Sequence, residues 1–102
     1  MLVEAVPNLS LTPEDPGLDE VLDALARAHE PGWALLDVHA DKDHGRTVLT
    51  LAGAPAPLSR ALEVMIETTL AVGDITAHQG VHPRVGLVDV LPLIPLHQAR
   101  WR

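Results

Sequence analysis

The chain is 102 residues long, which fits a single domain with one hydrophobic core. Its formal net charge of −7 argues against nucleic-acid binding, and no apolar run reaches the roughly 20 residues that span a bilayer. The absence of cysteine excludes disulfides and thiolate chemistry, and Trp33 and Trp101 are the only Phe, Tyr or Trp residues, so the core must be aliphatic.

The first part of the chain predicts a strand, a polar loop and a helix. Residues 2–6 are β-prone and end at the turn dipeptide Pro7-Asn8, after which we expect a loop over 8–17. Asp15-Pro16 suits the start of a helix, because Asp is a preferred N-cap and Pro is tolerated at the first helical position. Apolar residues from Leu18 onward then recur at helical spacing until Pro31-Gly32.

The middle of the chain predicts a β-hairpin. Residues 33–38 are almost continuously apolar, which is typical of a central strand. A polar connection over 39–45 leads to a third strand over 46–52. Asp37 and Asp41 beside this connection are either acid–base partners or turn-capping residues, and we favour the turn.

The last part predicts a second helix and a fourth strand. Apolar residues from Leu58 to Leu70 have helical periodicity, with Gly73 as the expected C-cap. We expect a loop over 74–84 and a strand or extended segment over 85–96, whose later half must lie at a sheet edge, at a bulge or beyond the sheet because Pro92 and Pro95 cannot donate to a ladder. The order β-α-β-β-α-β predicts an α+β, ferredoxin-like domain over residues 1–96, a four-stranded antiparallel sheet with both helices on one face, followed by a tail over 97–102.

The segment from His78 to Leu96 is the most informative part of the chain. His78, His82 and Arg84 lie in a loop with Gly and Pro, which leads into the apolar run of the fourth strand. A base with a pKa near ~6.5 beside a fixed cation suits acid–base chemistry on an anionic substrate. The alternative interpretation places His82 on the surface without a role, pairs Arg84 with Asp74 or Asp89, and gives Asp89 a structural role.

Four segments make the chain resemble the N-terminal part of glutamate formiminotransferase, a family often fused to a cyclodeaminase. They are Val3-Glu4-Ala5-Val6-Pro7-Asn8-Leu9-Ser10, Leu35-Leu36-Asp37-Val38, Gly45-Arg46-Thr47-Val48-Leu49-Thr50 with Gly53, and the segment from His78 to Leu96. The resemblance implies transfer of a formimino group from N-formimino-L-glutamate to N5 of tetrahydrofolate. It places the family's catalytic histidine at His82.

The resemblance also implies roles for the residues around His82. Arg84 would bind a carboxylate of the glutamate or the folate, and His78 would tune His82 or contact substrate. His39 stands where the family has the second Asp of an Asp-x-Asp pattern, which lies near the catalytic histidine and helps to orient it, and we place His39 among the substrate- or folate-binding residues. Tetrahydrofolate is then a co-substrate and no metal is expected: Gly80 and Pro83 disfavour a helical His78–His82 ligand pair, although His39 and His44 supply further imidazoles.

Two functions remain open at this stage. The chain is either a folate-dependent formimidoyltransferase subdomain or a non-catalytic ferredoxin-like module that binds an anion or a protein. In both cases the bare sheet face requires a cover, which is either a second copy in a homodimer or a second subdomain. The N-terminus has no recognisable signal peptide, so we expect a cytoplasmic protein without membrane or nucleic-acid partners.

Overall fold

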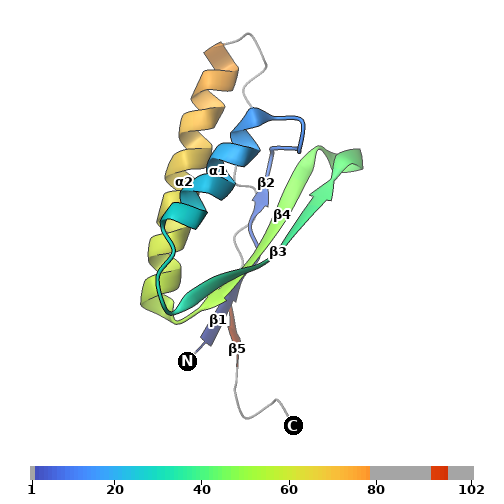
Figure 1. The fold of residues 1–102 in the computed structure, drawn as a ribbon. Helices are drawn as coiled ribbons and strands as arrows, with labels where there is room; N and C mark the ends of the chain where they lie inside the picture. Colours follow the sequence, from blue (N-terminus) through green and yellow to red (C-terminus); the bar gives the residue numbers. More distant parts are fainter. Residues whose placement is uncertain (1, 79–92, 97–102) are drawn as a thin grey trace.

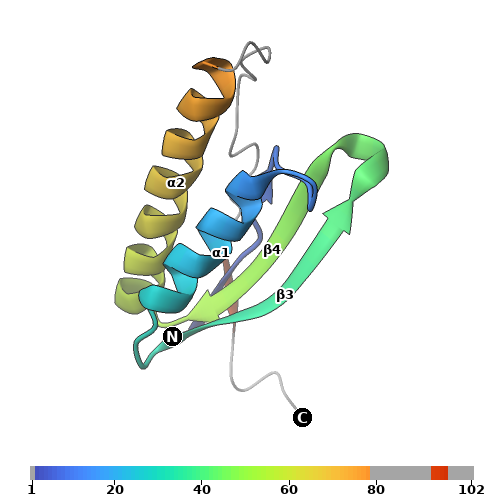
Figure 2. The ribbon, with the colours of Figure 1, turned by 45° about the horizontal axis from the view of Figure 1, so that its top comes forward.

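A computed structural model describes residues 2–78 and 93–96 of the chain. It is an α+β domain, in which α1 (Pro16–Arg27) and α2 (Pro55–His78) lie side by side against one face of an antiparallel sheet (Figures 1 and 2). The strands are β1 (Leu2–Ala5), β2 (Asn8–Leu9), β3 (Trp33–Asp41), β4 (Arg46–Gly53) and β5 (Leu93–Leu96), with a 3-10 turn over Lys42–His44. The predicted α+β, ferredoxin-like class is confirmed.

β1 and β2 together occupy one strand position in the sheet. β1 and β2 pair with successive parts of β4, with Val3 opposite Gly53 and Asn8 opposite Val48. The prediction of a loop from residue 8 onward was therefore wrong over β2. Pro7 lies between the two strands and has no amide hydrogen to donate. Its carbonyl accepts a hydrogen bond from Leu49 N (3.0 Å), so this stretch remains bonded to β4 between β1 and β2.

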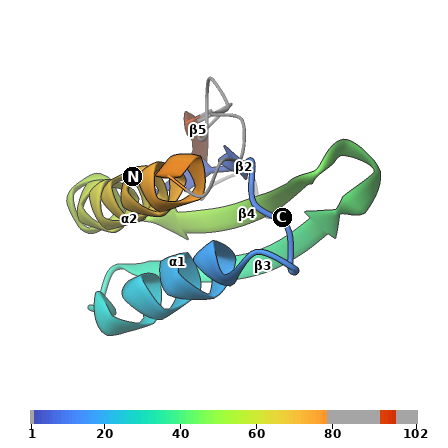
Figure 3. The ribbon, with the colours of Figure 1, turned by 90° about the horizontal axis from the view of Figure 1, so that it is seen from above.

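The sheet has four strand positions in the order β5, β1/β2, β4, β3. Figure 3 separates the two edges, with β5 on one side and β3 on the other. Pro95 lies opposite Val3 in β5, which is an edge among the described strands and so one of the positions predicted for it. The prediction that β3 is a central strand was wrong, because among the described strands it pairs only with β4. Of its apolar run, Trp33 is buried and Leu35 is half-buried, whereas Ala34, Leu36 (61% exposed) and Val38 (41%) are exposed.

Both helices begin close to where the sequence predicts. Asp15 is the N-cap residue of α1, but its carboxylate accepts hydrogen bonds from Thr12 (N at 2.7 Å, Oγ1 at 3.1 Å) instead of from the helix. α2 continues to His78, so the predicted C-cap at Gly73 and the start of the following loop were wrong. One glycine in a helix interior costs only about 1 kcal/mol, which does not end a helix of 24 residues. Neither described helix is long and apolar enough to cross a membrane.

The core lies between the helices and the sheet and is aliphatic apart from Trp33, as predicted. β4 alternates strictly, so that Thr47, Leu49, Leu51 and Gly53 are buried on the helix side. The largest fully buried hydrophobic side chains are Leu9, Leu25, Leu49, Leu51, Leu58, Met65 and Val21. The alternate residues of β4 point to the opposite side of the sheet, which no described element covers. We call this side the open face.

Candidate functional site

A β-bulge at Leu36 directs the polar half of β3 onto the open face. Leu35 lies opposite Leu51, but Asp37 lies opposite Thr50, so Leu36 is an extra residue in the strand. In a regular strand Asp37 would share the helix side with Leu35, since side chains alternate with a period of two. The bulge places it on the open face instead, and His39 follows two residues later on the same side.

Residues from three strands line up across the open face. Asn8, Val48 and His39 share one rung of the sheet, with Val48 in the middle. Thr50 and Asp37 form the next rung. Cross-strand neighbours have Cβ atoms about 4.5–5.5 Å apart, and residues two apart on a strand are separated by about 6–7 Å. Asp37, His39 and Asn8 therefore lie within reach of one small bound molecule.

The tip of the β3–β4 hairpin holds an ionic cluster. His44 Nδ1 lies 2.8 Å from Asp41 Oδ2, the His44 amide donates to Asp41 Oδ1 (3.3 Å), and Arg46 Nε lies 3.4 Å from Asp41 Oδ2. Partial desolvation raises the pKa of Asp41, but the hydrogen bonds from His44 and the charge of Arg46 outweigh it and hold this pKa below its ordinary value. The turn-capping interpretation is confirmed for Asp41, whereas Asp37 lies outside the turn.

Of the predicted site residues, His39 is the one whose side chain the structure describes, and it is exposed on the open face. His78 is the last residue of α2, and its side chain lies outside the described part. His82 and Arg84, with Asp89, also lie outside the described residues. Their grouping with His39 therefore stays a prediction. Among the described side chains, no three His, Asp or Glu residues are placed to hold a metal ion.

Three further residues of the open face were not selected as site residues from the sequence: Asn8, Arg46 and Thr50. They come from β2 and β4, and only long-range strand pairing brings them beside β3. One local signal was present, because Asp37, His39 and Asp41 recur at every second position, the spacing of one strand face.

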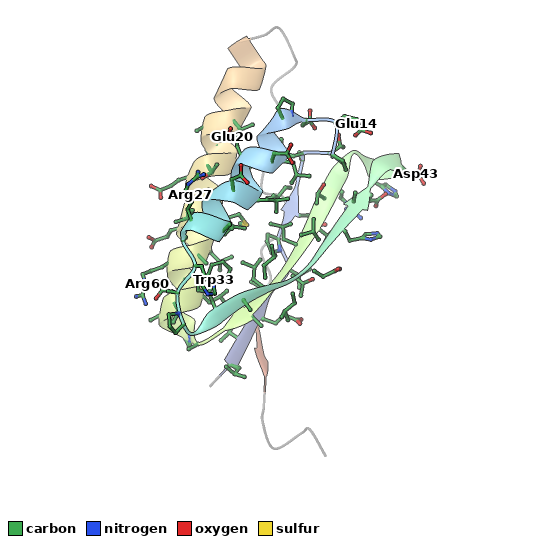
Figure 4. The ribbon with its side chains drawn as sticks, viewed as in Figure 1. Glu14, Glu20, Arg27, Trp33, Asp43 and Arg60 are labelled. Atoms are coloured by element: carbon green, nitrogen blue, oxygen red, sulfur yellow. The ribbon has the colours of Figure 1, made fainter. Side chains whose placement is uncertain are left out.

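A separate groove of about 340 Å³ lies on the helix side of the sheet, between α1 and β3. It is lined by Leu22, Leu25, Ala26, His29, Trp33, Ala34 and Leu35. Trp33 Nε1 is buried there without a hydrogen-bond partner among the described atoms. Figure 4 shows Trp33 and Asp43 at opposite ends of the hairpin, so this groove is remote from the ionic cluster.

Comparisons with known proteins identify relatives along almost the whole chain. Residues 2–102 match the formiminotransferase domain, N-terminal subdomain. A Mus musculus protein named formimidoyltransferase-cyclodeaminase is 40% identical over 97 residues, covering 93% of this chain but 17% of the mouse protein. Proteins named glutamate formimidoyltransferase from Streptococcus pyogenes serotype M1 and Thermoplasma acidophilum are 35% and 33% identical, and the chain covers 31% and 32% of their lengths.

Proposed function

Because the chain belongs to the formiminotransferase N-terminal subdomain family, we propose that its open face forms one wall of a formimidoyltransferase site. The proposed reaction transfers a formimino group from N-formimino-L-glutamate to N5 of tetrahydrofolate, the co-substrate, in the cytoplasm. The family match over residues 2–102 is the observation that carries this proposal. The position of Asp37 and His39, side by side on the uncovered face, supports it.

In this proposal His82 moves the protons. The N5 amine must lose a proton as it attacks the formimino carbon, and the departing glutamate nitrogen must gain one. A histidine with an ordinary pKa near ~6.5 can accept the first proton and donate the second at neutral pH. Arg84 binds a substrate carboxylate through two parallel hydrogen bonds, and His78 and His39 contact the substrates. No step requires a metal.

The proposed site is incomplete within this chain. The chain spans about one third or less of the relatives it matches. The open face has no cover among the described elements, and Asp37 and His39 are exposed on it. We therefore propose that the second subdomain of a complete transferase, in the same polypeptide or in another, covers the face and completes the folate site.

A chimera tests the proposal. Residues 2–102 would replace the matching segment of the Thermoplasma acidophilum relative, and formimino transfer to tetrahydrofolate would be measured. We expect activity in the chimera, and a loss of about 100-fold or more in kcat with His82→Ala. The matched control is His29→Ala, an exposed histidine on the helix side, which should retain full activity. A folded chimera without activity, or with activity that His82→Ala leaves intact, would refute the proposed chemistry.

One observation favours the non-catalytic alternative. Among the described side chains of the open face, Glu4, Asp37 and Asp41 are acidic, and Arg46 already lies beside Asp41. The substrates carry carboxylates, which this part of the face would repel. If the alternative is correct, His39→Asp will not raise the activity of the chimera. If the face still supports transfer, restoring the family's carboxylate there should raise kcat/KM.

A further inference from the structure

The sheet edge at the start of β3 presents backbone groups that no described strand pairs with. The amide of Ala54 donates to the Gly32 carbonyl (2.8 Å), and residues of an antiparallel pair exchange such hydrogen bonds at every second position. Ala34 therefore bonds to β4, whereas the N–H and C=O groups of Trp33 and Leu35 point away from β4. Among the described strands β3 pairs only with β4, so these groups are available to an added strand.

The same two residues line the apolar groove of about 340 Å³ between α1 and β3. Trp33 is 7% exposed, and its Nε1 donor has no acceptor among the described residues. Leu36 follows as the bulged residue, so the regular edge beside the groove ends at Leu35. A short extended segment fits this combination of groove and edge, because it supplies backbone hydrogen bonds and places apolar side chains on one side.

The rim of this groove on α1 is acidic. Leu22 and Ala26 of α1 line the groove. Asp19 and Asp23 stand three residues before them, and residues at this spacing are neighbours on a helix surface. Both carboxylates are exposed, and neither forms an ion pair with another described residue. The cation of α1 is Arg27, which Figure 4 shows on the side of the helix away from β3, so the rim attracts positive charge.

We propose that the β3 edge over residues 33–35 binds an extended, basic peptide segment of a partner protein, which adds an antiparallel strand to the sheet. The peptide backbone bonds to the free groups of Trp33 and Leu35, and its apolar side chains fill the groove. Its lysine or arginine side chains extend along the groove to Asp19 and Asp23. Backbone hydrogen bonds then supply affinity, and the groove and its rim select the peptide sequence.

The acidic rim also argues against a second copy of this chain at the same edge. α1 lies beside β3 (Figure 3), so two β3 strands paired about a two-fold axis would bring the two α1 helices together. The Asp19 and Asp23 carboxylates of both copies would then approach one another. Like charges placed together weaken an interface, whereas a basic peptide satisfies the same carboxylates.

The test uses the isotope-labelled 102-residue chain and the capped peptide Lys-Thr-Val-Thr-Val-Thr-Lys, whose valine and lysine side chains share one side of a strand. Bound peptide should slow hydrogen exchange of the Trp33 and Leu35 amides by about threefold or more. The Ala34 amide already bonds to β4, so its exchange should change little. The indole signal of Trp33 should also shift, and Trp33→Phe identifies this signal against that of Trp101.

Altered peptides test the strand geometry. In an antiparallel pair the valines lie opposite Trp33 and Leu35 and direct their N–H groups at β3, whereas the N–H of the central threonine faces solvent. N-methylation of either valine should therefore weaken binding about fivefold or more, and N-methylation of the central threonine should be tolerated. Glutamate in place of both lysines should remove binding. Equal tolerance of the two N-methylations, or equal binding of the glutamate peptide, would overturn the proposal.

Matched variants of the chain test the rim. Asp19→Asn with Asp23→Asn should weaken binding about threefold to tenfold, as expected for two exposed ion pairs, and raised salt should weaken it further in the wild type. Glu20→Gln with Glu67→Gln removes the same charge from exposed positions outside the groove and should leave binding unchanged. Equal effects of the two double variants, or a dimer by sedimentation with residues 33–35 at its interface, would contradict a basic peptide as the occupant.

Discussion

A single buried hydroxyl fixes the chain segment that follows β2. Thr47 Oγ1 donates a hydrogen bond of 2.6 Å to the carbonyl of Leu11, and Thr47 is fully buried. In the same segment, the side chain of Leu11 is buried in the core, and Thr12 bonds locally to Asp15. Thr47 therefore helps to hold this segment beside the β2 end of the sheet, where Asn8 faces the candidate site.

Replacing Thr47 with valine tests this role at the residue scale. Thr47→Val keeps the shape of the side chain but leaves the Leu11 carbonyl without its hydrogen-bond donor. This loss should lower the free energy of unfolding by about 1–3 kcal/mol. Thr50→Val is the matched control, because it makes the same change on the open face of the same strand and should change stability by less than about 0.5 kcal/mol. Urea unfolding measures both, and equal effects would show that the hydrogen bond contributes nothing.

At the scale of elements, the sequence predicts those features that depend on the local spacing of apolar residues. Both helices, the β3–β4 hairpin and the aliphatic core follow from apolar spacing and from turn residues such as Asp15-Pro16 and Pro31-Gly32. The edge position of β3 and the pairing of β2 did not follow, because they depend on which distant strand lies alongside. Of the candidate site, His39 was selected from the sequence, but its companions Asn8 and Thr50 required the register of the sheet.

The bulge in β3 yields a prediction about deletion of Leu36. Without this residue, Leu35 and Asp37 become consecutive and keep their present partners, Leu51 and Thr50, in a regular strand. The deletion should therefore preserve the fold, with a change in the free energy of unfolding of about 1 kcal/mol or less. Deletion of Val38 is the contrasting variant, since it moves a polar side chain, Asp37 or His39, into the Val38 position opposite Leu49 and should destabilise the domain more than the Leu36 deletion does.

The Leu36 deletion and the Val38 deletion would be compared by amide spectra and urea unfolding. We expect a native-like amide spectrum for the Leu36 deletion and a poorly dispersed spectrum for the Val38 deletion. The regular edge left by the Leu36 deletion should also aggregate more readily, because bulges protect exposed edge strands. Loss of cooperative unfolding in the Leu36 deletion would contradict this account of the bulge.

The contact between the helices predicts an unusual effect of alanine in α1. Gly17 faces Val72 of α2 so closely that a Cβ atom at Gly17 would overlap the Val72 side chain. Gly17→Ala should therefore destabilise by about 1–3 kcal/mol, although alanine normally favours a helix. Val72→Ala should remove most of this penalty in the double variant. A double-mutant cycle measures the coupling, and additive effects would indicate that the helices do not touch there.

At the scale of the whole molecule, an ion pair joins the loop before β3 to α2 at the end of the domain away from the hairpin tip (Figure 4). Arg60 donates two hydrogen bonds to Glu30, Nη2–Oε1 at 2.8 Å and Nε–Oε2 at 3.0 Å. These bonds from Arg60 are the main reason that the pKa of Glu30 is lowered. At the opposite end, the pKa of Asp41 is also lowered, despite partial desolvation, by His44 and Arg46.

These two carboxylates predict how stability responds to acid. A carboxyl group whose pKa is lower in the folded state contributes stability above its ordinary pKa, near 4, and loses it as the pH falls through the folded value. As the pH falls from 7 to about 5, protonation also reduces the net charge of −7, and the weaker repulsion between like charges stabilises the folded state. We therefore expect the melting temperature to change little, or to rise slightly, down to about pH 5 and to fall below about pH 4.

Arg60→Gln isolates the Glu30 contribution from the general effect of charge. Its melting temperature should lie about 1–4 °C below that of the wild type at pH 6, since the pair is exposed and its contribution is small. The difference should shrink below pH 4, where Glu30 becomes protonated in both proteins, and in high salt at neutral pH. Arg27→Gln removes an exposed arginine from α1, and any difference that it causes should not depend on the titration of Glu30. A difference between wild type and Arg60→Gln that persists unchanged to pH 2 would mean that Arg60 stabilises the domain through its aliphatic stem and not through its bond to Glu30.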